Sequence, residues 1–457
     1  MQQADLIIEA GHIATVDATL GRIRDGAVAV KAGRIAAVGP REALHARWRA
    51  GQVHRHPRAL MVPGLVDAHV HPGLFFFARL APAPTPERPG LLARGGQIER
   101  FLNLLTGGLR LDPGQTRIAA RASLLRALES GVTYFNDAAA GDTDALAEAA
   151  RETGVRGVVT YDFGADLGFD LGRDPPMPVR IAQADALLAR AEAIVARHHG
   201  RDGMQCWYNL LCDLNASDEL YVETTRLARR DGVGINTHSS TVLRHEAASR
   251  RLYGRDSVRR LLDLGVLGPH WIGAHMGFVA EEDWPALAAT GAHVAHCPAT
   301  SMGSGKQIIE RGAIPAMRRA GIPVALGTDS AQWPDLPQQM SLAYYAHKEV
   351  LGDDAVFPPD EVLEMATLAG ARACAQEAGR GSISPGKTAD LVLVDTDSPR
   401  FAPFADPLLA WMRSGGVAPL DVYVEGRLRV RGGQAVDLDR ERFVREARAA
   451  AEAIVRR

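Results

Sequence analysis

The sequence predicts an α/β protein in which a parallel (β/α)8 barrel is joined to a small β-sandwich domain made from both ends of the chain. Eight short apolar segments alternate with segments whose apolar residues recur at helical spacing. Eight parallel strands are the number that closes such a barrel. Strand-like runs separated by Gly-rich turns at both ends of the chain predict the second domain.

Length and composition fit a globular protein larger than one ordinary domain. The chain has 457 residues, of which 46% are hydrophobic and 23% are charged. The formal net charge of −2 provides no general field for nucleic acid or for an anionic membrane. We therefore expect a small-molecule substrate, and neither a nucleic-acid nor a membrane partner.

The four cysteines and the first residues predict a cytoplasmic protein. The cysteines form no Cys-x-x-Cys pair, so neither a disulfide framework nor a zinc ribbon is indicated. The first ten residues lack the basic and apolar stretches of an export signal. No apolar run reaches the roughly 18 residues of a membrane helix.

Residues 1–60 form the first part of the small domain, and residues 61–380 form the barrel. The small domain has predicted strands at 5–10, 27–31 and 34–38, and Gly33 supplies the positive φ of a hairpin. Predicted helices within the barrel include 219–230, 257–264 and 314–319, and its strands are predicted at 62–71, 131–137, 155–162, 205–211, 234–238, 271–275, 292–296 and 323–329.

Residues 72–113 form a long irregular section after the first barrel strand. It contains three consecutive phenylalanines at 75–77 and a Pro-rich run at 81–89. A loop of this length inside a compact domain usually has a function. We expect a lid or a binding loop, and the alternative is a packed surface excursion.

Residues 381–457 complete the small domain. They follow a predicted helix at 360–373 and contain a strand at 391–395 and a hairpin around 422–429. We expect these strands to join those of the N-terminal segment. The last stretch, 440–457, is expected to be an exposed amphipathic helix.

The first barrel strand organises the predicted active site. Its sequence, PGLVDAHVH, ends in His69 and His71, whose side chains share one face because strand residues alternate between faces. Two imidazoles at a strand end can bind one metal ion. Later strands end in His238, His275 and Asp329, so all five side chains are expected at the C-terminal mouth of the barrel.

These motifs together resemble the amidohydrolase superfamily. They match, in order, its branch of cytosine and S-adenosylhomocysteine deaminases and triazine (atrazine) chlorohydrolases: PGLVDAHVH, the strand-end His238 and His275, HCP at 296–298, GTDS around Asp329, and GSISPGKTADLVLVD. The resemblance covers nearly the whole chain. It implies a distorted TIM (β/α)8 barrel, a composite β-sandwich domain from both termini, and a homo-oligomer of two or more subunits.

The resemblance also implies roles for single residues. His69, His71, His238 and Asp329 would bind one divalent metal ion, zinc in the first place, with iron, cobalt or manganese as alternatives. Asp329 and the unligated His275 would be the catalytic residues beside the metal-bound water. His296 would lie behind the ligands near the strand rim, and a purely structural role is its alternative.

The chemistry of this residue set agrees with hydrolysis. Three imidazoles and one carboxylate leave a coordination position for water, and a divalent ion lowers the pKa of a bound water from 15.7 toward roughly 7. Asp329 can accept a proton from that water, and His275 can orient it or stabilise a developing oxyanion.

A missing lysine predicts one metal ion rather than two. In binuclear members of the superfamily a carboxylated lysine bridges the ions, but the sequence has no lysine between His71 and His238. We therefore expect a mononuclear site, although Asp162 or Cys206 could replace the bridge in principle.

Three departures from the family pattern concern the substrate. Thr241 stands where the deaminases carry a glutamate that moves a proton to the ring nitrogen, and a hydroxyl cannot act as a carboxylic acid near neutral pH. Glu246 follows five residues later and is expected to face outward on a helix. The Asn-Met after HCP is replaced by residues 300–302, and the glycine after the strand-eight aspartate by Ser330.

Hydrolysis of an amide, urea or carbamate-like C–N bond needs no such glutamate. The expected function is therefore that of a mononuclear metal-dependent hydrolase acting on a small apolar or heterocyclic molecule. Alternatives are an aromatic aminohydrolase (deaminase), a triazine-type chlorohydrolase and, remotely, a non-catalytic scaffold. Candidate substrate contacts are Phe75, Trp207, Thr241, Ser330 and Trp333.

Overall fold

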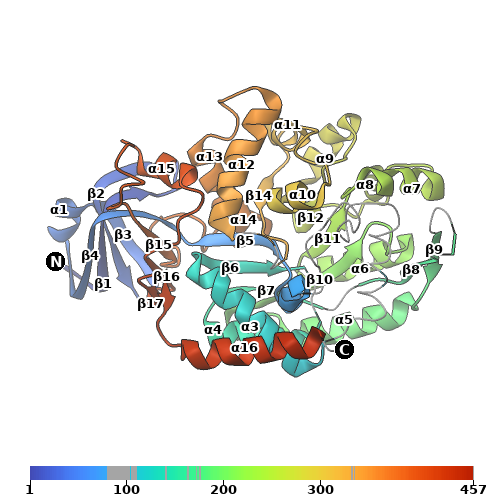
Figure 1. Cartoon of the computed structure of the whole chain (residues 1–457), viewed down its shortest axis with the longest axis horizontal. Helices are drawn as coiled ribbons and strands as arrows, with labels where there is room; N and C mark the ends of the chain where they lie inside the picture. The colour runs from blue at the N-terminus through green and yellow to red at the C-terminus, as the bar shows by residue number, and fades with distance from the viewer. Residues whose placement is uncertain are drawn as a thin grey trace.

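The structure is a computed structural model that describes residues 1–79, 103, 111–138, 141–161, 164–170, 172–173, 177–330, 333 and 335–455. Figure 1 shows a sheet built from the N-terminal residues at one end of the molecule and the barrel with its surrounding helices at the other. None of the helices in these ranges is both long enough and apolar enough to cross a bilayer.

The barrel strands are parallel and follow one another in chain order. An isolated bridge between Val70 and Asp329 brings the last strand beside the first. In the described ranges the sheet consists of β5 (Leu65–Val70), β6 (Val132–Asp137), β7 (Arg156–Thr160), β10 (Gln205–Cys212), β11 (Ile235–Ser239), β12 (Trp271–His275), β13 (His293–His296) and β14 (Val324–Leu326). The structure contains every predicted barrel strand, so the predicted fold class is confirmed.

Helices cover the outside of the barrel. Their ends carry the expected capping residues: in α6 the Ser217 hydroxyl accepts a hydrogen bond from Leu220 N, and Gly232 ends the helix with a φ of 67°. The helices are α3 (Pro113–Glu129), α4 (Thr143–Thr153), α5 (Ala184–His198), α6 (Asp218–Asp231), α7 (Leu243–Tyr253), α8 (Ser257–Asp263), α9 (Trp284–Thr290), α10 (Pro298–Ser304), α11 (Ala313–Arg319) and α12 (Leu336–Leu351).

The predicted helix at 360–373 is two helices. Thr367, at φ −133° and ψ −86°, leaves helical geometry between α13 (Pro359–Met365) and α14 (Leu368–Ala373). Shorter elements complete the chain: α1 (Arg41–His45), η1 (Pro72–Arg79), β8 (Leu167–Asp170), β9 (Met177–Arg180), η2 (Arg201–Gly203), η3 (Glu281–Asp283) and α15 (Pro407–Arg413).

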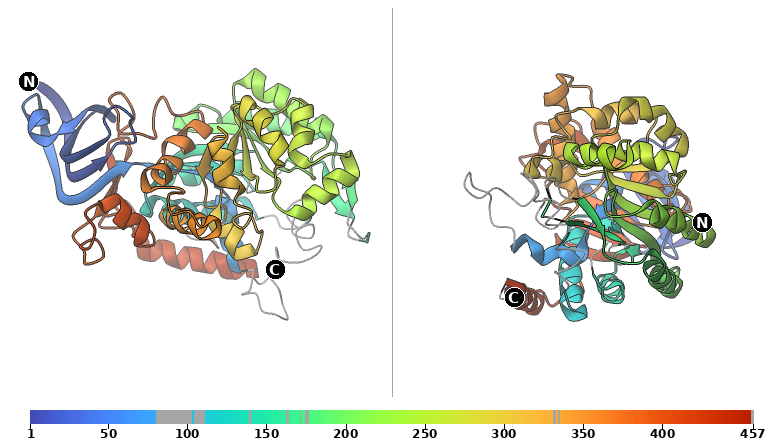
Figure 2. Two further views of the ribbon diagram at one scale, coloured as in Figure 1. Left: turned by 90° about the horizontal axis from the view of Figure 1, so that it is seen from above. Right: turned by 90° about the vertical axis from the view of Figure 1, so that its right-hand side faces the viewer.

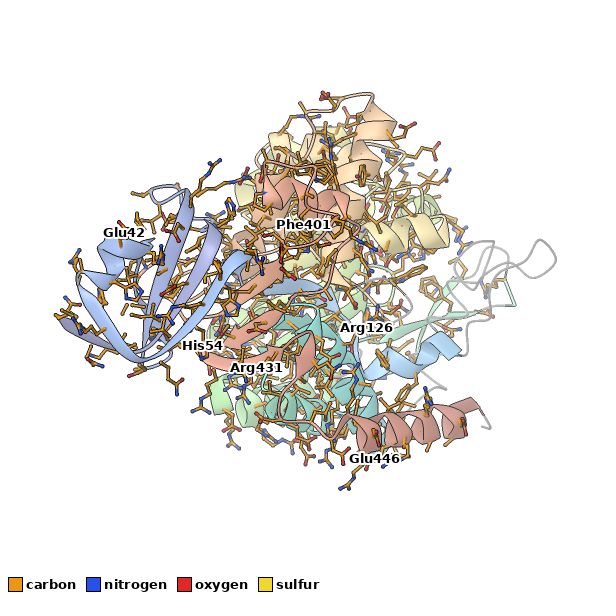
Figure 3. The ribbon with its side chains drawn as sticks, turned by 60° about the vertical axis from the view of Figure 1, so that its left-hand side comes forward. Glu42, His54, Arg126, Phe401, Arg431 and Glu446 are labelled. Atoms are coloured by element: carbon orange, nitrogen blue, oxygen red, sulfur yellow. The ribbon has the colours of Figure 1, made fainter. Side chains whose placement is uncertain are left out.

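Both ends of the chain build the second sheet. It runs in the order β18-β17-β16-β15-β4-β1-β2-β3 in the described part of the chain. Its strands are β1 (Gln2–Ala14), β2 (Arg22–Lys31), β3 (Arg34–Pro40), β4 (Trp48–Pro63), β15 (Leu391–Asp395), β16 (Asp421–Val424), β17 (Arg427–Arg431) and β18 (Gln434–Ala435). Figure 3 shows the two halves together, with His54 on β4 and Arg431 on β17 labelled.

The composite domain differs from the prediction in two details. Its strands form one continuous sheet, with separate buried clusters that contain Ile8 and Leu391 in one and Ile7 and Leu44 in the other. The sequence did not predict β4, because its first eleven residues are mostly polar and exposed or half-buried. Antiparallel pairing of β4 with β15 joins the two ends of the chain.

The C-terminal helix α16 (Arg440–Val455) lies along the barrel beside α3 and η1 (Figures 1 and 2). Phe443 and Ala451 are buried, and the Arg121 guanidinium lies 4.8 Å from the centre of the Phe443 ring. The helix is amphipathic as predicted, but its apolar face is covered rather than exposed.

The predicted lid at 72–113 begins with η1, and most of it lies outside the described residues. Asn103 is described: its amide donates to Phe169 O at 2.7 Å and accepts from Phe169 N at 2.8 Å. This pair of hydrogen bonds attaches Asn103 to β8.

Candidate metal centre

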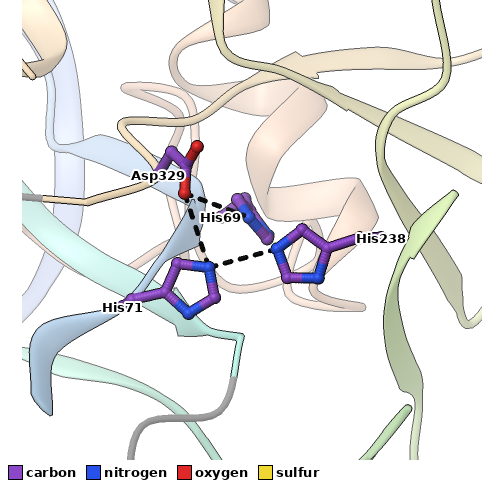
Figure 4. Close-up of side chains that lie close together, drawn as sticks. All are labelled: His69, His71, His238 and Asp329. Atoms are coloured by element: carbon purple, nitrogen blue, oxygen red, sulfur yellow. Dashed lines mark hydrogen bonds and ion pairs between the residues drawn. The ribbon is translucent and has the colours of Figure 1, made fainter. Parts of the chain in front are cut away.

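Four predicted ligands come together at the C-terminal mouth of the barrel (Figure 4). The ligand atoms of His69, His71, His238 and Asp329 all lie within 4.8 Å of one another. His71 Nε2 lies 3.2 Å from His238 Nε2 and 3.4 Å from Asp329 Oδ1, and His69 Nε2 lies 3.9 Å from the same oxygen. Atoms that share one ion at 2.0–2.2 Å stand about 3–4 Å apart, so the geometry fits a single cation.

The hydrogen bonding and protonation of the imidazoles also fit a bound cation. His69 Nε2 is buried and has no hydrogen-bond partner among the described residues, an arrangement that costs free energy unless something else binds it. Burial and the neighbouring imidazoles lower the pKa of His69 well below its usual range, and burial and His71 lower that of His238 to about 3. Both rings are therefore neutral and offer a lone pair.

A network between β5 and β14 fixes the ligand positions. Asp329 N donates to His69 O at 2.8 Å, and His71 N donates to Asp329 O at 2.7 Å. The Asp67 carboxylate accepts from His69 N at 3.2 Å, from Thr328 N at 3.0 Å and from the Thr328 hydroxyl at 2.6 Å. Burial raises the pKa of Asp67 to about 7. Asp67 was not predicted from the sequence, although it shares a strand face with His69 and His71.

The ring of His238 is oriented by a carbonyl group. His238 Nδ1 lies 2.6 Å from Leu211 O, so Nδ1 carries the proton and Nε2 faces the other ligands. The end of β10 thus sets the tautomer of a ligand on β11.

Backbone strain also marks the site. His275, Met276 and Asp329 have φ values of 75°, 47° and 65°, in the left-handed region that residues with a Cβ rarely adopt. Such conformations cost about 1–3 kcal/mol each and cluster at functional sites.

His275 lies beside the ligands but has a different neighbour. Its Nε2 lies 3.9 Å from Asp329 Oδ2 and 3.2 Å from the Nζ of Lys306. Burial, with Lys306 as the next cause, lowers the pKa of His275 well below its usual range. Lys306 was not predicted from the sequence, because it follows α10 in a loop that no strand pattern marks.

His296 contacts a residue outside the group of four candidate ligands. Its Nε2 is 3.1 Å from the Nε2 of His347 on α12. This contact joins the end of β13 to α12.

The predicted aromatic residues lie in three places. Trp207 is in the main core, where its ring covers Gly234. Trp333 is half-buried against Gly303. Phe75 packs with Phe76 near α3 and α16 rather than at the ligands.

The two predicted hydroxyl residues stand near the ends of β11 and β14. Thr241 is buried, and Ser330 is half-buried with its carbonyl accepting from Trp333 N at 3.0 Å. Each follows its metal-ligand candidate closely in the sequence, Thr241 by three residues and Ser330 by one.

Glu246 is buried, and the expectation that it faces outward was wrong. Its carboxylate accepts from Ser257 N at 2.9 Å, and burial together with Asp213 raises its pKa to about 7. The expected helical position was correct, but the side of α7 that carries Glu246 packs against the ends of β10 and α8.

A second buried group consists of Cys212, Asp213 and His245, whose ligand atoms also lie within 4.8 Å of one another. Asp213 Oδ2 accepts from Ser240 N at 2.7 Å, and Cys212 Sγ donates to Asn215 Oδ1 at 2.9 Å. The first bond joins the loops after β10 and β11, and the second lies within the turn after β10.

Of the two residues considered as substitutes for the bridging lysine, Cys206 is not part of the first group. Cys206 is buried on β10, and burial raises its pKa to about 12. Asp162 lies outside the described residues. The mononuclear site therefore stays a prediction.

Comparisons with known proteins agree with this architecture. A model described as the amidohydrolase family matches residues 60–429, and one described as an imidazolonepropionase-like composite domain of bacteria matches residues 26–50. A 5-methylthioadenosine/S-adenosylhomocysteine deaminase of Syntrophobacter fumaroxidans is 30% identical over 417 residues, which are 89% of this chain and 88% of the relative.

Two solved structures share the fold. An adenosine deaminase from Xanthomonas campestris with bound zinc has a TM-score of 0.88 at 24% identity and full coverage of both chains. A variant of the atrazine chlorohydrolase from Arthrobacter aurescens TC1, complexed with zinc and atraton, has a TM-score of 0.83 at 21% identity, covering 98% of this chain and 100% of that one.

Proposed function

Because this chain belongs to the amidohydrolase family, we propose that it is a mononuclear metal-dependent hydrolase acting on carbon–nitrogen bonds other than peptide bonds. The preferred substrates are small amides, ureas, carbamate-like compounds or N-heterocycles. One observation carries the proposal: His69, His71, His238 and Asp329 converge from three strands within 4.8 Å at the barrel mouth.

The four ligands would hold zinc in this proposal, with iron, cobalt or manganese as alternatives. The zinc in the two solved structures supports the choice. When bound, a divalent ion supplies a Lewis acid for the group under attack and lowers the pKa of a coordinated water.

Asp329 and His275 would move the protons. The Asp329 carboxylate can take a proton from the attacking water, and His275 Nε2, 3.9 Å from Asp329 Oδ2, can exchange a proton with it through one bridging water. As the C–N bond breaks, its electron pair stays on nitrogen and one of these groups returns the proton there. Burial of His275 keeps bulk water away from this exchange.

A second candidate, an aromatic aminohydrolase, is favoured by the name of the 30% identical relative, a deaminase. Thr241 is evidence against a deaminase. This buried residue stands at the position of the family glutamate and cannot act as a carboxylic acid. The chlorohydrolase alternative is supported only by likeness of fold to solved triazine-hydrolase structures.

The test is a hydrolysis screen of metal-loaded protein. It covers amides, ureas, carbamates and N-heterocycles, with product detection by mass spectrometry and ammonia detection in parallel. We expect amine release from the first three classes, with loss of turnover in Asp329→Asn and unchanged turnover in the exposed control Asp397→Asn. Strong ammonia release from aminated heterocycles alone would replace the preferred function with the second candidate, and no hydrolysis of any class would refute both.

The surroundings of the enzyme are part of the same proposal. The substrate is a small molecule, neither nucleic acid nor membrane is a partner, and the protein works in the cytoplasm as a dimer or larger homo-oligomer. The net charge of −2 supports the first two statements, and four buried free cysteines support a reducing compartment. Light scattering of the purified protein measures the assembly.

A further inference from the structure

Lys306 is a buried cation without a carboxylate partner. Apart from histidines, the described part of the chain buries two other cationic side chains, Arg260 and Arg380. Arg260 Nε donates to Asp218 Oδ1 at 2.6 Å, and Arg380 Nη1 donates to Asp390 Oδ2 at 2.5 Å. Among the described residues, no carboxylate oxygen lies within 4.0 Å of Lys306 Nζ. A buried ammonium without a partner costs several kcal/mol, so this position requires a reason.

The backbone around Lys306 is fixed by hydrogen bonds. Gly305, at a φ of 66°, turns the chain after α10, and Lys306 N donates to Ser301 O at 3.0 Å. The Ser301 hydroxyl accepts from Ile308 N at 3.1 Å and from Ile309 N at 3.4 Å. The lysine is therefore held in place by the fold and is not a flexible surface side chain.

The Lys306 ammonium lies at the edge of the metal centre. Its Nζ is 3.2 Å from His275 Nε2, and that nitrogen is 3.9 Å from Asp329 Oδ2, so Nζ lies no more than about 7 Å from this oxygen, the sum of the two distances. An ammonium has three N–H donors, of which one imidazole nitrogen can accept only one. Because Nζ has no other acceptor in the described ranges, two N–H groups are left for a ligand.

The carboxylate that attracts Lys306 is not available as its partner. The Asp329 carboxylate acts on the ammonium from beyond ion-pair distance, and in the proposed function it is bound to the metal. Thr241 has a hydroxyl where the related deaminases have a glutamate. The positive charge of Lys306 therefore has no counterpart among the described residues, and an anionic group of the substrate can supply one.

We propose that Lys306 binds a carboxylate of the substrate close to the scissile C–N bond. This inference rests on the proposed function and narrows its substrates to anionic amides and ureas, such as N-acyl and N-carbamoyl amino acids. In these compounds the carboxylate carbon is two bonds from the scissile nitrogen, which suits an ammonium no more than about 7 Å from Asp329 Oδ2. The two carboxylate oxygens match the two N–H groups left on Nζ.

Matched pairs of substrates test the proposal by hydrolysis with zinc-loaded protein. N-benzoylglycine is compared with N-ethylbenzamide, and N-carbamoylglycine with N-ethylurea, since each pair shares the scissile bond and differs in the carboxylate. Hydrolysis of N-benzoylglycine consumes one water and gives benzoate and glycine. We expect kcat/KM to be at least about 100-fold higher for the acid of a pair, and this preference to fall below about 10-fold in Lys306→Met, mainly through KM of the acid.

Two results of this comparison would overturn the proposal. One is a wild type that hydrolyses the acid and its neutral partner with equal kcat/KM. The other is an equal loss of kcat on both partners in Lys306→Met, which would mean that the lysine stabilises the developing oxyanion of every substrate. Lys306→Arg, which keeps the charge, should retain part of the preference, and the exposed Lys31→Met should retain all of it.

A binding experiment reads the same contact without turnover. Chelated, metal-free protein is titrated with N-benzoylglycine in a calorimeter, with N-ethylbenzamide as the neutral control. We expect the acid to bind at least about 10-fold more tightly than the neutral compound in the wild type and in Lys31→Met, and the difference to disappear in Lys306→Met. Equal affinities in the wild type would overturn the proposal even if Lys306→Met failed to fold.

The two experiments separate this inference from the proposed function. A wild type that hydrolyses nothing in the screen but binds N-benzoylglycine through Lys306 refutes the function and supports carboxylate binding. An active wild type that shows no preference for the acid, in turnover or in binding, supports the function and refutes carboxylate binding.

Discussion

Asp67 is predicted to make the stability of the metal-free protein fall as the pH rises. Burial raises the pKa of this carboxyl from 3.8 to about 7. The folded chain therefore holds the proton more tightly than the unfolded chain, so this contribution to stability is complete below about pH 4 and is lost as the pH rises to about 7. The whole difference corresponds to about 4 kcal/mol in the free energy of unfolding, of which about 2–3 kcal/mol falls between pH 5 and pH 8.

Asp67→Asn removes this dependence while keeping the contacts. An amide oxygen can accept from the N–H groups of His69 and Thr328, and the amide nitrogen can donate to the Thr328 hydroxyl. In chelated protein, urea unfolding followed by tryptophan fluorescence should show the variant gaining about 2–3 kcal/mol on the wild type between pH 5 and pH 8. Zinc should reduce the gain, because a nearby cation favours the ionised carboxylate.

The control for this experiment is Asp437→Asn, whose side chain is 80% exposed. Its free energy of unfolding should match that of the wild type at pH 5 and at pH 8. Parallel stability profiles of wild type and Asp67→Asn would refute the reasoning, because they would mean that Asp67 titrates alike in the folded and unfolded chains.

Three further predictions concern the substrate and the framework. Thr241→Glu should raise ammonia release from aminated heterocycles at least about 10-fold in a coupled assay, because it restores a carboxylic acid, whereas an equal gain in Thr241→Gln would contradict this reason. Arg260→Met should lower the free energy of unfolding by about 3–5 kcal/mol, because the buried guanidinium donates to Asp213 O and Ala216 O, while the exposed Arg255→Met should cost at most about 1 kcal/mol. Gly64→Ala should cost about 1–3 kcal/mol because its Cβ would overlap Thr133 and Asp390, whereas Gly51→Ala meets open space; equal thermal shifts would refute the overlap.

The barrel and the convergence of the four candidate ligands could be predicted because they depend on local patterns. Alternation along a strand puts His69 and His71 on one face, and parallel strands bring their C-terminal ends to one mouth, where the structure has His238 and Asp329. The same alternation could have indicated Asp67. These residues are determined by their position in a strand, which the sequence shows directly.

The rest depends on contacts between distant segments. Lys306 reaches His275 only because Gly305 and Ser301 turn the loop after α10 toward β12. Glu246 lies on a helix that was correctly expected, but which side of α7 is buried depends on its contacts with distant segments. The strand β4 is long because it pairs with β1 and β15, while much of its own sequence is polar.

The metal content of the purified protein tests the central claim most directly. Elemental analysis should find one divalent ion per chain. Removal of the ion by a chelator should abolish turnover and readdition of zinc should restore it, while a His71→Asn, His238→Asn double variant should retain no ion. Full turnover by the metal-free chain, or one tightly bound ion in the double variant, would contradict the account.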